Sequence, residues 1–128
     1  MDFSCQATTL TPSVWLDAEG RALRIEGECY PENPAAFFRP LVEALDAVRL
    51  EAGPSLEVRC RLTYVNSASL AWFRRILAWL DANSREGGEL RVVWEYDEGD
   101  DGALELAYDL TSGLPHVDLV EQRLGTPS

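Results

Sequence analysis

The stretch "LEVRCRLTYVNSASLAWFRRIL", residues 56–77, changes its hydrophobic period once. Up to Tyr64, apolar residues alternate with polar ones, as in a β-strand with one buried face. From Ser67 onward the apolar residues, among them Phe73 and Leu77, recur at the spacing of a helix. The sequence therefore predicts a strand and then a helix, joined by a short polar junction.

Strand and helix patterns continue on both sides of this junction. The alternation around the turn signal at residues 18–20 predicts a β-hairpin. Asn33 and Pro34 form a good N-cap and first-turn pair, so a helix should begin there, with Pro40 as a new turn or a kink. Gly53-Pro54 and Gly87-Gly88 mark the expected ends of the two helices. The remaining patterns predict a strand, a helix and a short final strand in "ELRVVWEY", "ALELAYDL" and "HVDLV".

These elements give the order β-β-α-β-α-β-α-β. Strands separated by helical patterns favour some parallel pairing, so the expected class is α/β with a mixed central sheet. The length of 128 residues and the 46% hydrophobic content suit one domain over 1–128, with loose ends at about 1–10 and 122–128.

Charge and cysteine content narrow the functional class. The chain has 11 basic and 22 acidic residues, and the net charge of −11 disfavours nucleic acid and anionic membranes as partners. Its three cysteines show no C-x-x-C spacing, no signal-peptide pattern opens the sequence, and no apolar run approaches the roughly 20 residues of a membrane span. We expect a soluble cytoplasmic protein.

Three stretches together resemble one protein family. They are "GECYPENP" at residues 27–34, "LTYVNSAS" at 62–69 and "VVWEYDEGDD" at 92–101. Their order and spacing are similar to those of the SiaC-type regulatory phosphoproteins of bacteria. The resemblance implies a fold like that of sulfate-transporter-and-anti-sigma-antagonist (STAS) domains, of the SpoIIAA-like kind. It also implies control by a serine/threonine kinase and a phosphatase, without catalytic activity or a cofactor.

In the best-known system of that family the unphosphorylated protein binds and activates a diguanylate cyclase in biofilm control, and phosphorylation breaks the complex. Carried onto this chain, the resemblance places the phosphorylated hydroxyl at Ser67, directly after Asn66. Ser67 stands where a Thr is usual, Ala68 replaces a hydroxyl residue, and Cys29 replaces a Ser. The change at Ala68 bears on which kinase would recognise the loop. The candidate partner-binding residues are Tyr30, Glu32, Asn33, Asn66 and Ser69 in these motifs, and Trp72 on the helix that follows.

Structural roles could explain several of these residues equally well. Either Asn66 or Ser67 could simply cap a helix, because both side chains can accept a hydrogen bond from a free N–H group. The capping chemistry of Asn33-Pro34 is an alternative to partner contact there. Trp72 and Phe73 point about 100° apart on a helix, so one of them should lie at the edge of the core.

Other functional classes have weaker support in the sequence. No Gly-x-Ser-x-Gly, P-loop or G-x-G-x-x-G motif is present, and the lone His116 has no metal-ligand pattern around it. A thiol enzyme would need Cys29 or Cys60 to pair with His116, without a local signature. An anti-sigma-factor antagonist in a partner-switching pathway remains an alternative, because the same fold class often works in that way.

We predict that the acidic run Asp97–Asp101 binds no calcium tightly. With Asp97 as the first ligand, Gly99 falls at the third position and Tyr108 at the twelfth, where a bidentate Glu belongs. Calorimetric titration with calcium tests this prediction. A dissociation constant of about 1 μM or lower would contradict it.

Overall fold

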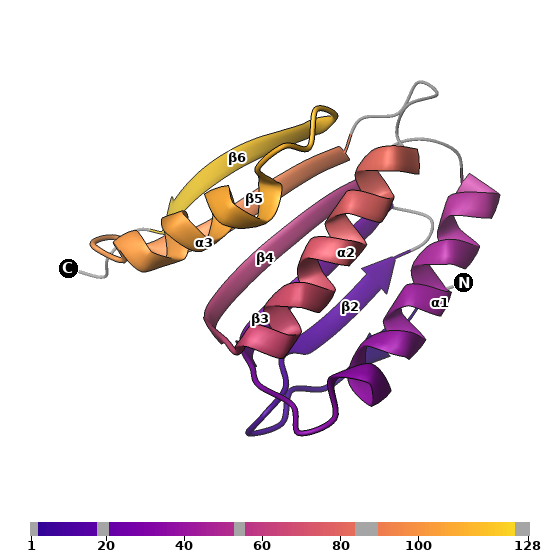
Figure 1. The fold of residues 1–128 in the computed structure, drawn as a ribbon, viewed down its shortest axis with the longest axis horizontal. Coiled ribbons are helices and arrows are strands. Elements are labelled where there is room, and N and C mark those ends of the chain that lie inside the picture. Colours follow the sequence, from indigo (N-terminus) through magenta and orange to yellow (C-terminus); the bar gives the residue numbers. More distant parts are fainter. Residues whose placement is uncertain (1–2, 18–20, 53–55, 84–89, 125–128) are drawn as a thin grey trace.

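A computed structural model describes residues 3–17, 21–52, 56–83 and 90–124, and the side chains of residues 48–52 lie outside the description. Three helices pack against one six-stranded sheet (Figure 1). No helix among the described residues is long and apolar enough to cross a membrane. The elements are, in chain order, β1 (Phe3–Cys5), β2 (Ser13–Asp17), β3 (Ala22–Cys29), α1 (Pro34–Ala52), β4 (Leu56–Val65), α2 (Ser67–Asn83), β5 (Leu90–Asp97), α3 (Asp101–Thr111) and β6 (Val117–Leu124).

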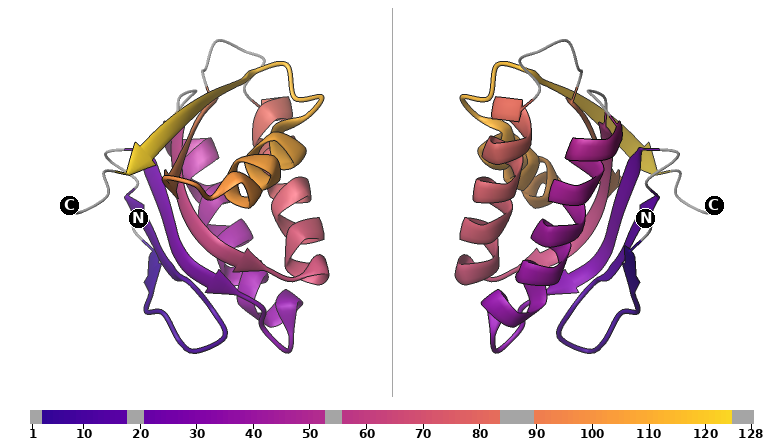
Figure 2. Two further views of the ribbon diagram at one scale, coloured as in Figure 1. Left: turned by 90° about the vertical axis from the view of Figure 1, so that its left-hand side faces the viewer. Right: turned by 90° about the vertical axis from the view of Figure 1, so that its right-hand side faces the viewer.

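The strands follow one another in the sheet in the order β1-β2-β3-β4-β5-β6, which is also their order in the chain. The first three strands pair antiparallel, and β3 to β6 pair parallel. Each parallel connection therefore steps the same way across the sheet. Crossovers of one hand that step in one direction place their helices on one face, and the two side views show all three helices on that face (Figure 2).

The predicted fold class is confirmed, with differences at the two ends. β1 and the end of β6 are strands where loose ends were expected, so the order begins with three strands instead of two. Pro40 lies inside α1 on its exposed side, and the helix continues through it. The turn at residues 18–20 and the helix-ending pairs Gly53-Pro54 and Gly87-Gly88 lie outside the described residues.

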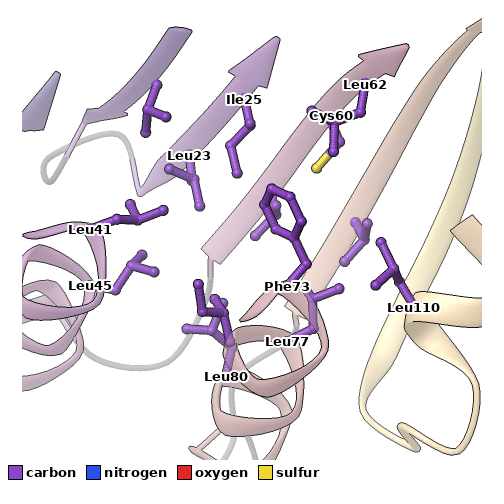
Figure 3. Packing of buried hydrophobic residues seen from close by; sticks show 14 of the residues in the cluster. Leu23, Ile25, Leu41, Leu45, Cys60, Leu62, Phe73, Leu77, Leu80 and Leu110 are labelled. Carbon is purple, nitrogen blue, oxygen red and sulfur yellow. The ribbon is translucent and has the colours of Figure 1, made fainter. Parts of the chain in front are cut away.

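The hydrophobic core lies between the sheet and the three helices. Phe73, Leu77 and Leu80 of α2 point from the middle of the helix layer toward the sheet (Figure 3). They meet Ile25 and Cys60 of the two central strands, which are almost fully buried. α2 is thus held against the sheet along its length, and its first turn is fixed relative to the ends of β3 and β4.

A β-bulge changes the direction of Tyr64. The parallel register between β3 and β4 pairs Gly27 with Leu62 but Glu28 with Tyr64, so Thr63 is an extra residue on β4. Gly27 has φ +126°, and an added Cβ would lie 3.4 Å from the Pro12 backbone. The extra residue moves the following side chain to the other face of the sheet. The prediction that Tyr64 continues the buried alternation is therefore wrong, and its side chain is 54% exposed.

The sheet face without helices, here called the helix-free face, carries a network of ion pairs. Glu95 accepts hydrogen bonds from Arg24 Nη2 at 3.0 Å and Arg59 Nη1 at 2.9 Å, and its side chain is 8% exposed. Burial alone would raise the pKa of Glu95. The hydrogen bonds from Arg59 and Arg24 and the charges of both guanidinium groups outweigh that effect, so its pKa is lowered.

Replacing Glu95 by Gln should lower the free energy of unfolding near neutral pH by roughly 1–3 kcal/mol, because two partly buried guanidinium groups lose their carboxylate. A lowered carboxyl pKa stabilises the fold above the ordinary carboxyl range, and this stabilisation is lost as the pH falls through the folded-state value. Urea unfolding from about pH 7 to pH 3 should therefore show a shallower acid dependence in Glu95→Gln than in wild type.

Glu26→Gln is the matched control, because Glu26, whose side chain is 43% exposed, also pairs with Arg24, at 3.2 Å. The free energy of unfolding of this variant should fall by no more than about 1 kcal/mol. Equal losses in the two variants would show that the burial of Glu95 adds nothing to its ion pairs.

Candidate functional site

The candidate site lies where β3 and β4 end side by side. Both strands are parallel, and their last residues, Cys29 and Val65, are register partners. After β4, Asn66 leads directly into α2, which begins at Ser67. The Asn66 N–H donates to the Cys29 carbonyl oxygen at 3.0 Å. After β3, the loop that begins at Tyr30 leads into α1 at the same edge of the sheet. The motifs of residues 27–34 and 62–69, far apart in sequence, are thereby brought together.

Asn66 is the residue that caps α2. Its Oδ1 accepts a hydrogen bond from the Ser69 N–H at 2.9 Å, and its carbonyl oxygen accepts from the Leu70 N–H at 2.9 Å. Ser67 is the first residue of the helix and is exposed. The prediction that Ser67 lies in the first turn is confirmed. Because Asn66 supplies the cap, the Ser67 hydroxyl is not needed for that role.

The N-terminus of α2 presents positive electrostatic potential. The first N–H groups of a helix have no acceptor within the helix. The Asn66 side chain accepts a hydrogen bond from one of them, the N–H of Ser69. The first turn of α2 contains no acidic residue, whereas α3 has Asp101 in its first turn and Asp100 as its cap. An anion on Ser67 would therefore meet free N–H groups and the positive end of the helix dipole.

Ser69 lies beneath this surface and is fully buried. Its expected role in direct partner contact is therefore wrong for this conformation. Its oxygen has no hydrogen-bond partner among the residues that the structure describes, although the hydroxyl lies near the Cys29 thiol and acts to lower its pKa. Burial has the larger effect and raises the pKa of Cys29. Both small side chains fill the interior below the junction.

Two tyrosines stand beside the junction. The rings of Tyr30 and Tyr64 meet edge to face, with centroids 5.5 Å apart. Partial removal from water and the neighbouring Glu28 raise the pKa of Tyr30, so its hydroxyl stays neutral at neutral pH. The sequence analysis did not include Tyr64 among the site residues. The sequence signal for the outward direction of Tyr64 was Gly27 in "EGEC", whose positive φ lies at the bulge.

The loop before α1 combines a structural residue with an exposed one. Asn33 caps α1, because its Oδ1 accepts from the Ala36 N–H at 3.3 Å and its carbonyl oxygen from the Phe37 N–H at 3.3 Å. The capping prediction for Asn33 is thus confirmed, and both Asn33 and Glu32 are exposed.

Trp72 lies at the edge of the core, as the helical spacing predicted. Its ring stacks on Phe38 of α1 with centroids 5.5 Å apart and an interplanar angle of 8°. Phe73, one residue later, is 4% exposed and faces the sheet. Trp72 is therefore partly accessible from the side of α2, one and a half turns from Ser67.

The residues considered for metal binding or catalysis have structural roles. Asp100 Oδ1 accepts from the Ala103 N–H at 3.1 Å and so caps α3. The exposed His116 precedes β6, and its N–H donates to Asp81 Oδ1 at 2.7 Å. Burial raises the pKa of Cys60 to about 12, so its thiol is protonated at neutral pH.

Three helices lie on one face of a mixed sheet, and an exposed hydroxyl stands at the capped start of the middle helix, so the protein is a small α/β domain with an accessible hydroxyl. Residues 5–123 match the model described as SiaC family regulatory phosphoprotein, so the chain belongs to the SiaC family. The resemblance seen in the three sequence motifs is thereby confirmed.

Individual relatives agree with this assignment. An uncharacterized protein of Pseudomonas aeruginosa (strain UCBPP-PA14) is 27% identical over 106 residues, which cover 83% of this chain and 84% of that protein. The structure of SiaC of P. aeruginosa superposes with a TM-score of 0.88 at 24% identity, covering 97% of this chain and 99% of that one. SiaC in the crystal structure of diguanylate cyclase SiaD with its activator SiaC gives 0.89 at 24% identity, with 95% and 99% covered.

Replacing Asn66 by Ala should lower the free energy of unfolding by about 0.5–2 kcal/mol, because the Ser69 N–H loses its acceptor. Ser67→Ala is the matched control one residue away, and its effect should stay within about 0.5 kcal/mol. Urea unfolding of the unphosphorylated proteins measures both. An equal loss in Ser67→Ala would mean that the Ser67 hydroxyl shares the capping role.

Proposed function

We propose that this protein is a phosphorylation switch, in which the state of Ser67 controls binding to a diguanylate cyclase. The supporting observation is the division of roles at the junction. Asn66 caps the helix, and the adjacent hydroxyl is exposed at the helix start. A kinase and a phosphatase would set the state of Ser67, and the output would be cyclic di-GMP signalling in biofilm regulation.

The fold can accept a phosphate on Ser67 without unfolding. The hydroxyl lies at the N-terminus of a helix of 17 residues whose apolar side is buried along its length. A phosphate there is stabilised by free N–H groups and the helix dipole. The domain should therefore keep its structure in both states, and regulation would act on its surface.

Phosphorylation would change that surface by charge. A phosphoserine adds about −1.5 to −2 charges to a chain of net charge −11. A partner that packs against a neutral hydroxyl would have to desolvate this phosphate, which is costly without a compensating cation. The affinity for such a partner should fall.

The kind of partner is proposed by analogy with a relative in the same family. SiaC of P. aeruginosa is described as the activator of the diguanylate cyclase SiaD. We assign the same class of partner to this chain, whose fold covers nearly the whole of that protein. The surface around the junction that would contact it includes Tyr30, Tyr64, Glu32 and Trp72, with Asn66 holding the loop.

Binding, without catalysis of its own, is the proposed mode of action. Cys29 and Cys60 are buried, and burial raises the pKa of both thiols, which keeps the thiolate nucleophile scarce. The cytoplasm is the proposed location, because the kinase and the cyclase would use cytoplasmic nucleotides and all three cysteines are free thiols.

Ser67→Asp should weaken binding to the cyclase by about tenfold or more, since about 1.4 kcal/mol suffices for a factor of ten. Ser67→Ala should bind like the unphosphorylated protein, and both variants should keep the wild-type circular dichroism. The cyclase is identified by mass spectrometry of proteins retained on unphosphorylated protein. Binding is then measured with purified cyclase, together with cyclic di-GMP formation.

Ser4→Asp is the control for charge alone, because Ser4 is exposed on β1, away from the junction. The native phosphorylation site is mapped on protein isolated from its own cells. The switch is refuted if Ser4→Asp and Ser67→Asp weaken binding equally, or if phosphate occurs only on another residue such as Thr63.

A further inference from the structure

An apolar groove lies on the outer side of the helix layer, between α1 and α2. It is lined by Val42 of α1 and by Trp72, Arg75, Ile76 and Trp79 of α2, and it encloses about 190 Å³. We call it the α1/α2 groove. The groove is distinct from the interior core, because it is open to solvent and bounded by side chains on the flank of α2.

The dimensions of the groove suit a helix. Trp72 and Trp79 are seven residues apart, which is two helical turns or about 10.5 Å along the axis. A partner helix that lies along α2 presents apolar side chains at positions i, i+4 and i+7 over the same distance. Val42 and Ile76 supply aliphatic surface between the two indole rings.

Arg75 lines this groove, and Arg39 is an exposed arginine on the neighbouring helix α1. Arg75 lies over the Trp72 ring, 6.0 Å from its centroid, and Arg39 is one turn before Val42 on the same side of α1. Neither has a carboxylate within salt-bridge distance among the residues that the structure describes. By contrast, a carboxylate lies within that distance of Arg24, Arg59, Arg61, Arg74, Arg91 and Arg123.

We infer that the α1/α2 groove binds an amphipathic helix of the partner that carries aliphatic residues at i, i+4 and i+7 and acidic residues along its flanks. The apolar residues would fill the groove, and the acidic residues would pair with Arg39 and Arg75. This inference rests on the proposed function for the identity of the partner, and it adds the place and the chemistry of docking.

The groove also gives the phosphate on Ser67 a specific effect. Ser67 precedes Trp72 by five residues on α2, so the phosphate would lie roughly 7.5 Å along the axis from the start of the groove and about 140° around it. An acidic partner helix that extends past the start of α2 would bring its own carboxylates toward the negatively charged phosphate. Coulombic repulsion then adds to the desolvation cost.

Two synthetic peptides of about 16 residues test the groove directly. Both carry Leu at i, i+4, i+7 and i+11, with Glu on the flanks of one and Lys on the flanks of the other. Each is titrated into the full-length protein labelled with fluorotryptophan. Fluorine NMR should show saturable shifts of Trp72 and Trp79 with the Glu peptide, while Trp15, on the helix-free face, and the buried Trp94 stay unchanged.

The double variant Arg39→Glu, Arg75→Glu should bind the Glu peptide about tenfold more weakly and bind the Lys peptide in its place. Both arginines are exposed, so the fold should be unaffected. Arg123→Glu, on the exposed side of β6, is the matched control and should bind like wild type. Equal shifts with both peptides, shifts at Trp15 instead, or no shift at either groove tryptophan would overturn the inference.

Binding of the variants to purified cyclase distinguishes this inference from the proposed switch at Ser67. Weaker binding of the double arginine variant and of Ser67→Asp supports both proposals. If only Ser67→Asp weakens binding, the groove is refuted and the switch stands. If only the arginine variant does, the groove stands and the switch at Ser67 is refuted. If no cyclase binds, the cyclase assignment fails, and the peptide titration still decides the groove.

Discussion

The hydrogen bonds of Asn66 connect the sheet to the site. Its N–H donates to the carbonyl oxygen of Cys29 at the end of β3, and its side chain accepts from the third residue of α2. One residue therefore fixes the end of one strand, the end of its neighbour and the start of the helix. The position of Ser67 follows from this arrangement, because Ser67 is the first residue of the helix whose start Asn66 fixes.

Much of the fold could be predicted from the sequence, because the relevant signals are local. The change of period before Ser67 and the Asn33-Pro34 pair depend on contacts within a few residues, and the structure agrees with both. The ends were predicted less well. β1 is only three residues long and is defined by its pairing with β2, which no local pattern reveals.

The site was predicted in part for the same reason. Ser67 was found through its place in a motif and a helix start. Tyr64 was misjudged because its direction depends on the register with the neighbouring strand, and Ser69 was misjudged although it lies on α2. The extra residue opposite β3 turns Tyr64 outward, and the packing of α2 on the sheet turns Ser69 inward. A pattern of period two does not show the direction of Tyr64 unless the bulge is recognised first. The helical period did contain the signal for Ser69, which lies four residues before Phe73 on the buried stripe of α2.

The identical order of strands in the sheet and in the chain has a consequence for folding kinetics. Every strand pairs with the strand that precedes it in sequence, so each new pairing closes a loop no longer than one helix and its connections. The entropic cost of loop closure then arises in successive steps, each of which closes one helix and its connections. A chain of this topology can extend its sheet from β3 onward one helix and strand at a time, as each emerges during synthesis.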